Sequence, residues 1–153
     1  MELDHLLAFV VTRDGIQIDP TKFEAIMNLS MPRNITQHKI LEGKEKALRR
    51  FVNNYAELTK GFMRLLKKGV PFLWEYQSQC SFDTLKSSLI LTLVLYPSNY
   101  GHDLFLYLFA FVSTIGMVLV QLDDDNNEHV MYYLSKGLVG VEIHYPHMEK
   151  LVL

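Results

Sequence analysis

The stretch LFLYLFAFVSTIGMVLVQ, residues 104–121, decides the fold of this 153-residue chain. It is rich in aromatic and β-branched residues, which favour strands, and Val112-Ser113 supplies a short break within it. A third apolar run follows after the polar stretch 122–129. We therefore predict three antiparallel strands, at residues 104–111, 114–121 and 130–134.

The same stretch has the composition of a short membrane span. Residues 104–120 carry no charge, and seventeen residues lie at the lower limit for crossing a bilayer. Ser113 and Gly116 in the middle, and flanks that are acidic rather than basic, disfavour this interpretation. A hairpin whose strands are covered on both faces has the same continuous apolar pattern. We expect the buried hairpin, and a small membrane-associated protein stays as an alternative.

The N-terminal segment predicts a hairpin followed by a helix. Strand-forming residues between 6 and 18 flank a turn at Arg13-Asp14-Gly15. Asp19 is a suitable N-cap, and Pro20 is tolerated in the first helical turn because its missing amide needs no partner there. We expect this helix to stop near Pro32.

The middle and the end of the chain have mainly helical periodicity. Apolar residues recur every three or four positions between 35 and 66, which predicts two or three linked helices broken at Gly43 and Gly61. Tyr55 lies in this apolar stripe, so we expect it in the core rather than stacked on a base. Helices are also expected at residues 79–91 and 141–153, the last one cut off while still apolar. The predicted fold class is α+β: an N-terminal β-hairpin, a helical segment, then a mostly antiparallel sheet with a truncated helix.

Charge is unevenly distributed around a net value of -2. Residues 33–68 hold ten Lys or Arg against three Asp or Glu, a net of +7, whereas residues 1–32 carry -3 and residues 69–153 carry -6. A block of one sign is typical of a segment that binds a polyanion, although a solvated helical face has the same composition. The candidate phosphate contacts are Lys44, Lys46, Arg49, Arg50, Lys60, Arg64, Lys67 and Lys68.

Other residues exclude several classes of protein. Apolar residues make up 49% and charged residues 21%, as in a globular chain. The single Cys80 forms neither an internal disulfide nor a multi-cysteine zinc site, and the first seven residues lack a signal-peptide pattern, so we expect an intracellular protein. Residues 123–127 lack the ligand spacing of a calcium loop and predict a solvated turn. His144 and His147 are three residues apart, whereas a helical zinc pair is spaced by four.

Several short motifs, each weak alone, resemble one family when taken in order. They are FVVTRDGI (9–16), RRFVNNYA (49–56), LLKKGVPFLW (65–74), TIGMVLVQ (114–121) and YYLS (132–135). Together they are similar to the Pol polyproteins of gypsy-type LTR retrotransposons, in a plant-like lineage. The resemblance implies that residues 1–32 are the end of the reverse transcriptase palm, residues 33–75 thumb and connection helices, and residues 76–153 a truncated ribonuclease H-like domain.

The resemblance also implies which catalytic groups are expected. A working ribonuclease H gathers about four carboxylates around two divalent ions, which active relatives supply as Mg²⁺. The first carboxylate would stand at Phe109, and of the others only Glu149 matches the family motif, while the polymerase aspartates lie upstream in the family. We therefore expect a non-catalytic fragment without a cofactor.

The expected partner is an RNA–DNA hybrid or another nucleic acid, bound without sequence specificity because phosphate contacts carry no sequence information. The remainder of a Pol polyprotein is a further candidate partner. A decayed open reading frame without activity stays as the alternative.

Overall fold

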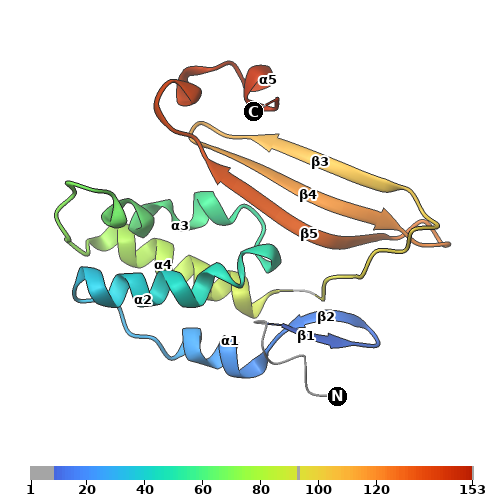
Figure 1. The fold of residues 1–153 in the computed structure, drawn as a ribbon, viewed down its shortest axis with the longest axis horizontal. Coiled ribbons are helices and arrows are strands. Elements are labelled where there is room, and N and C mark those ends of the chain that lie inside the picture. The colour runs from blue at the N-terminus through green and yellow to red at the C-terminus, as the bar shows by residue number, and fades with distance from the viewer. Residues whose placement is uncertain (1–8, 93, 153) are drawn as a thin grey trace.

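A computed structural model describes residues 9–92 and 94–152, in which a layer of helices meets one edge of a three-stranded sheet (Figure 1). The predicted N-terminal hairpin is confirmed from Phe9 onward, with β1 (Phe9–Thr12) antiparallel to β2 (Gly15–Ile18). Residues 6–8 of that prediction lie outside the described residues. Gly15 has φ 136°, and its Cα faces the carbonyl of Leu95, so no Cβ fits there.

The helical layer begins where the sequence places its first cap. The carboxylate of Asp19 accepts a hydrogen bond of 2.8 Å from the Thr21 amide. The side chain of Asn34 accepts one of 2.9 Å from the Gln37 amide. The elements of this layer are α1 (Pro20–Met27), α2 (Ile35–Lys46), η1 (Arg49–Phe51), α3 (Tyr55–Met63), η2 (Arg64–Leu66) and α4 (Tyr76–Ile90).

The expected helix breaks at Gly43 and Gly61 are wrong, because both residues lie inside helices. Gly61 is instead the point where α3 approaches α4: an added Cβ would overlap the Ser81 hydroxyl and lie 2.9 Å from the Gln77 carbonyl oxygen. The break falls between α2 and α3, where Asn54 adopts a left-handed conformation with φ 53°. Apolar side chains of that connection turn into the core and stabilise it.

The hydrophobic core lies between the helices. Tyr55 is 6% exposed and belongs to it, as predicted. Val130 and Tyr133 of the sheet pack against this core, so the sheet is anchored on the helical layer. The core residues are Ile26, Leu41, Leu48, Phe51, Val52, Tyr55, Phe62, Phe82, Leu85, Leu89 and Leu95.

The three predicted strands are confirmed as an antiparallel sheet in the order β3-β4-β5. Their bounds are β3 (Leu104–Ala110), β4 (Thr114–Leu122) and β5 (Glu128–Gly137). The expectation that the apolar hairpin is covered on both faces is wrong for β3, where residues 104–109 are all exposed. The helical layer contacts β5 and β4, whereas β3 lies at the far edge of the sheet and is contacted by α5 (Figure 1).

The C-terminal segment is not the single helix expected from residue 141. It forms η3 (Gly140–His144), then an extended Tyr145 before Pro146, then α5 (His147–Lys150). The Lys150 ammonium donates to the carbonyls of Phe111 and Val112 at 3.2 and 2.8 Å, which holds α5 over the β3–β4 turn. Among residues 9–92 and 94–152, no helix has the length and apolar character needed to cross a membrane.

Candidate nucleic-acid interface

A cleft of about 380 Å³ opens where the end of α2 and η1 face strand β5. We call it the basic cleft. One wall carries Lys46, Arg49 and Arg50, and the other is the backbone and side chains of residues 132–135. The local cause is the break after α2: a short 3-10 turn brings Arg49 and Arg50 beside the sheet while Phe51 turns into the core.

Arg50 joins the two walls of the basic cleft. Its guanidinium carbon lies 5.1 Å from the centre of the Phe9 ring and 5.2 Å from that of Tyr132, within range of favourable cation–π contact. Its Nε is buried and has no hydrogen-bond partner among the described residues. Arg50 therefore has a structural role between hairpin and sheet in addition to its charge.

Glu45, which directly precedes the cleft residue Lys46, forms a buried pair with Tyr55. The Tyr55 hydroxyl donates to Glu45 Oε1 at 2.7 Å, and Glu45 is 0% exposed. Burial raises the pKa of Glu45 to about 8, against the opposing effect of the Tyr55 hydrogen bond. Glu45 is therefore mostly neutral at pH 7, so it does not cancel the charge of Arg49, whose guanidinium lies 5.7 Å from the Tyr55 ring centre.

Two polar contacts fix α3 against the sheet next to the cleft. The Ala56 amide donates to the Ser135 hydroxyl at 2.8 Å, and the Thr114 hydroxyl donates to Glu57 at 2.8 Å. Glu57 also pairs with Lys60. The hydrogen bonds from Lys60 and Thr114 hold the pKa of Glu57 below its usual value despite partial burial. The beginning of α3 thus keeps one orientation relative to β5.

The other predicted phosphate contacts do not line the basic cleft. Lys60 is paired with Glu57, and Arg64 donates to Glu75 at 2.7 Å. Lys44, Lys67 and Lys68 are exposed, the last two just before Gly69, which has a φ of 83°. The structure therefore gathers three of the eight basic residues in one place: Lys46, Arg49 and Arg50.

Sequence reasoning missed the sheet wall of the cleft. Tyr132 and Ser135 belong to an alternating strand, and nothing in their spacing connects them with a basic segment eighty residues earlier. Only the pairing of β5 with β4 and its contact with η1 bring them beside Arg50. The number of charged residues in a segment identifies the basic wall of the cleft, but it does not identify the wall formed by β5.

The two positions tied to ribonuclease H chemistry do not form a metal centre. Phe109 is a 44% exposed residue of β3, and Glu149 is exposed on α5. Among the described residues no group of three or more His, Cys, Asp or Glu side chains could hold a metal ion. The residues present therefore do not fit a pair of divalent ions, which needs several convergent carboxylates.

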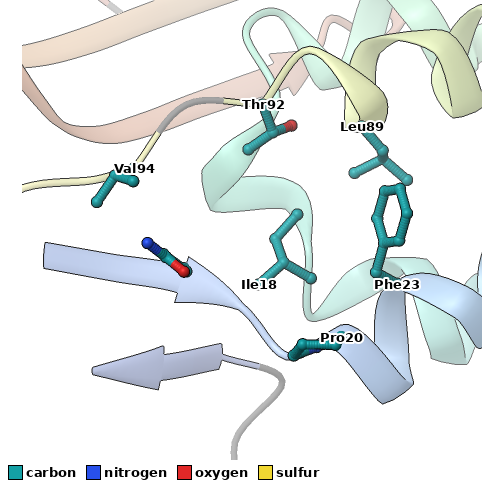
Figure 2. A pocket seen from close by; sticks show the side chains of 7 residues that line it. Ile18, Pro20, Phe23, Leu89, Thr92 and Val94 are labelled. Atoms are coloured by element: carbon teal, nitrogen blue, oxygen red, sulfur yellow. The ribbon is translucent and has the colours of Figure 1, made fainter. Parts of the chain in front are cut away.

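A second cavity, of about 390 Å³, lies between β2, α1 and the end of α4. Figure 2 shows Ile18, Pro20 and Phe23 on one side of it and Leu89, Thr92 and Val94 on the other. Among the described residues Gln17 completes the lining, and this part of the cavity wall is mainly apolar and carries no ionisable group. It offers no chemistry that would bind a charged ligand.

The family comparison covers the C-terminal half of the chain. Residues 74–153 match the family described as RNase H-like domain found in reverse transcriptase.

Curated relatives extend the match to almost the whole chain. The Pol polyprotein of transposon opus from Drosophila melanogaster is 30% identical over 96% of this chain and 16% of its own length. That of transposon 412 from the same organism is 32% identical over 79% of this chain and 10% of its own length. The chain thus spans less than a fifth of these relatives.

Solved structures show the same fold. A foamy viral protease-reverse transcriptase in complex with double-stranded DNA superimposes with a TM-score of 0.81, at 21% identity over 95% of this chain and 25% of that one. Another, in complex with an RNA/DNA hybrid, has a TM-score of 0.79 at 21% identity, over 95% of this chain and 20% of that one.

Proposed function

Because this chain belongs to the family of RNase H-like domains found in reverse transcriptase, within retrotransposon Pol polyproteins, we propose that it holds double-stranded nucleic acid without catalysing a reaction. The ligand we propose is an RNA–DNA hybrid, bound inside the cell through its phosphates. The contacts come from the basic cleft and are independent of base sequence.

The observation that carries this proposal is the convergence of Lys46, Arg49 and Arg50 on one cleft that has no acidic residue among its lining residues. Cations in a recess attract a polyanion more strongly than the same cations dispersed on a helix, because the low-dielectric walls focus the field. Tyr132 gives the same cleft an aromatic ring, which suits contact with sugar or base.

Two further points support the ligand class. The solved structures that share this fold were obtained with double-stranded DNA and with an RNA/DNA hybrid. The acidic groups of the chain lie outside residues 33–68 for the most part, so a bound polyanion meets the basic segment first.

The absence of catalysis is proposed on chemical grounds. Phe109 offers no metal ligand at the position where the family resemblance places an aspartate, and Glu149 alone cannot bridge two ions. The proposal is supported by the described residues, among which no group of three or more His, Cys, Asp or Glu side chains could hold a metal ion.

The test is a titration of a labelled RNA–DNA hybrid with the purified chain across a salt series. Lys46→Gln with Arg49→Gln should weaken binding and reduce the slope of log affinity against log salt by about two, since roughly one counterion is released for each phosphate contact. Arg50 is left in place because it also joins the sheet to the hairpin.

The matched control is Arg13→Gln with Lys22→Gln, which removes the same charge from exposed positions outside residues 33–68. Its affinity and salt slope should stay close to those of the unchanged chain. A folded chain that does not bind, or an equal loss in both double variants, contradicts the proposal. In that case the basic segment is a solvated face.

A further inference from the structure

One carboxyl group in the segment that forms the basic cleft is fully buried. Glu45 is 0% exposed, and it is followed by Lys46 and, one helical turn later, by Arg49, which both line the cleft. The Tyr55 hydroxyl donates to Glu45 Oε1 at 2.7 Å, whereas Oε2 is buried without a hydrogen-bond partner among the described residues. A buried carboxylate needs further hydrogen bonds or a nearby cation, so the ionised form of Glu45 is incompletely stabilised here.

Arg49 is the cation that the local structure places beside this carboxyl group. The Leu48 amide donates to the Glu45 carbonyl at 2.8 Å, so the chain still turns as a helix between Glu45 and Arg49. On a helix, a glutamate attracts a basic side chain that follows it by four residues. The Arg49 side chain is exposed, and its guanidinium carbon lies 5.7 Å from the ring centre of Tyr55, the residue whose hydroxyl bonds to Glu45. The guanidinium therefore reaches either a ligand in the cleft or the buried carboxyl group.

Glu45 is the member of this cluster that changes charge near neutral pH. Burial raises its pKa to about 8; the Tyr55 hydrogen bond opposes this rise, the like charge of Glu42 on α2 adds to it, and Arg49 of η1 opposes it. Burial, and then the charge of Glu45, raise the pKa of Tyr55 as well, so the phenol keeps its proton and stays a donor. Loss of the Glu45 proton thus creates a buried negative charge within reach of Arg49.

We propose that Glu45 is a positioning residue that controls how many phosphates the basic cleft holds, by leaving Arg49 free or binding it. While the carboxyl group is protonated, Arg49 and Lys46 are both free to contact phosphates. When the proton is lost to solvent, the Arg49 guanidinium turns to the carboxylate and pairs with it, and the cleft loses one phosphate contact. This inference rests on the proposed function, since it concerns the same cleft and the same ligand, an RNA–DNA hybrid.

Proton binding and nucleic-acid binding are linked by this arrangement. A phosphate held by Arg49 keeps the guanidinium away from Glu45, so the complex favours the protonated carboxyl group. Bound hybrid therefore raises the pH at which Glu45 ionises, and binding near pH 8 takes up protons from the buffer. The phosphodiester groups of the ligand stay ionised throughout this range, so the proton is taken up by the protein.

The first experiment titrates a labelled RNA–DNA hybrid across a salt series at about pH 7 and about pH 9, on either side of the pKa of Glu45. For the unchanged chain, the slope of log affinity against log salt should be smaller by about one at the higher pH, because one phosphate contact is lost. Glu45→Gln keeps an acceptor for the Tyr55 hydroxyl but cannot ionise, so its slope should be the same at both pH values. Near-UV circular dichroism of the same samples checks that each chain is folded.

Arg49→Gln separates this mechanism from a general effect of charge. It should have the smaller slope at both pH values, and adding Glu45→Gln to it should change the slope no further. Lys46→Gln also removes one contact but should keep the dependence on pH. Glu24→Gln, at an exposed position on α1, is the matched control for the loss of a carboxyl group and should behave as the unchanged chain does.

A measurement without nucleic acid keeps this inference separate from the proposed function. In carbon-detected NMR spectra of the free chain, the Cζ signal of Arg49 should shift with a midpoint near pH 8, and it should not shift in Glu45→Gln. Binding with the same slope at both pH values, an Arg49 signal that does not move, or unfolding of the chain at the higher pH overturns this inference and leaves the proposed function in place. No binding at either pH overturns the proposed function, and this inference with it.

Discussion

The hydroxyl of Tyr55 donates a 2.7 Å hydrogen bond to Oε1 of Glu45, and both side chains are withdrawn from solvent. This contact joins α2 to the start of α3. The second carboxylate oxygen of Glu45 is buried without a hydrogen-bond partner among the described residues. A protonated Glu45 suits this environment better than an ionised one.

Stability should fall with rising pH because of Glu45. Its pKa is raised from 4.5 to about 8, so the folded state keeps a proton that the unfolded state releases above about pH 4.5. The contribution is complete below about pH 4.5 and is lost as pH rises through about 8, amounting to a few kcal/mol. Glu45→Gln should flatten this part of the urea-unfolding profile. Glu24→Gln, on the exposed side of α1, should leave it unchanged.

Tyr55→Phe should destabilise the chain by about 1–3 kcal/mol, because it leaves a buried acceptor on Glu45 without its donor. The same change should raise the pKa of Glu45 further, since the hydrogen bond opposes the effect of burial. Thermal unfolding at two pH values measures both effects. Tyr76→Phe is the control because Tyr76 is 85% exposed, and an equal loss in both variants would speak against the pair.

His38 should make the chain sensitive to acid. It is 0% exposed among the rings of Phe62, Phe72 and Trp74, and neither ring nitrogen has a hydrogen-bond partner among the described residues. Burial lowers its pKa from 6.5, so below about pH 6.5 the unfolded state binds more protons and stability falls. His38→Leu should unfold at higher urea than the unchanged chain near pH 5.

Near pH 8 the advantage of His38→Leu should be smaller, because the imidazole is then neutral in both states. His147→Leu, at an exposed position on α5, should have the same stability difference at both pH values. A His38→Leu variant whose gain does not depend on pH would show that packing, not protonation, decides its effect.

Two helical glycines should respond to alanine in opposite directions. Gly43 has open space around its Cα, so Gly43→Ala should stabilise the chain by roughly 0.5–1 kcal/mol through helix propensity. Gly61→Ala should destabilise it by about 1–3 kcal/mol, because the new methyl group meets α4 at the Gln77 carbonyl and the Ser81 side chain. Urea unfolding of both variants measures the difference, and equal effects would contradict the close approach.

Local sequence patterns predicted which helices and strands form better than they predicted what those elements contact. The hairpin around Gly15, the Asp19 cap and the three strands follow from turn chemistry and alternation over a few residues, and all are confirmed. The predicted helix breaks at Gly43 and Gly61 were wrong because a glycine can also lie inside a helix, for reasons other than ending it. At Gly61 that reason is contact with α4, which is distant in sequence.

Exposure could not be predicted in the same way. The run from Leu104 to Val120 has the pattern of a fully buried hairpin, yet residues 104–109 are exposed because the helical layer meets the sheet mainly at β5 and β4. The surroundings of the basic residues could not be predicted either, although the sequence identifies eight candidates. The structure places Lys46, Arg49 and Arg50 in the cleft. It places Lys60 and Arg64 in ion pairs.

By itself the sequence determined the strands, most of the helices, the family and the segment that carries positive charge, because each depends on residue type and spacing along the chain. Only the tertiary structure decided that Arg50 lies between Phe9 and Tyr132, that Glu45 is buried, and that residues 104–109 are exposed. The contacts of Arg50 join residues far apart in the sequence, and no local pattern specifies which distant surfaces meet.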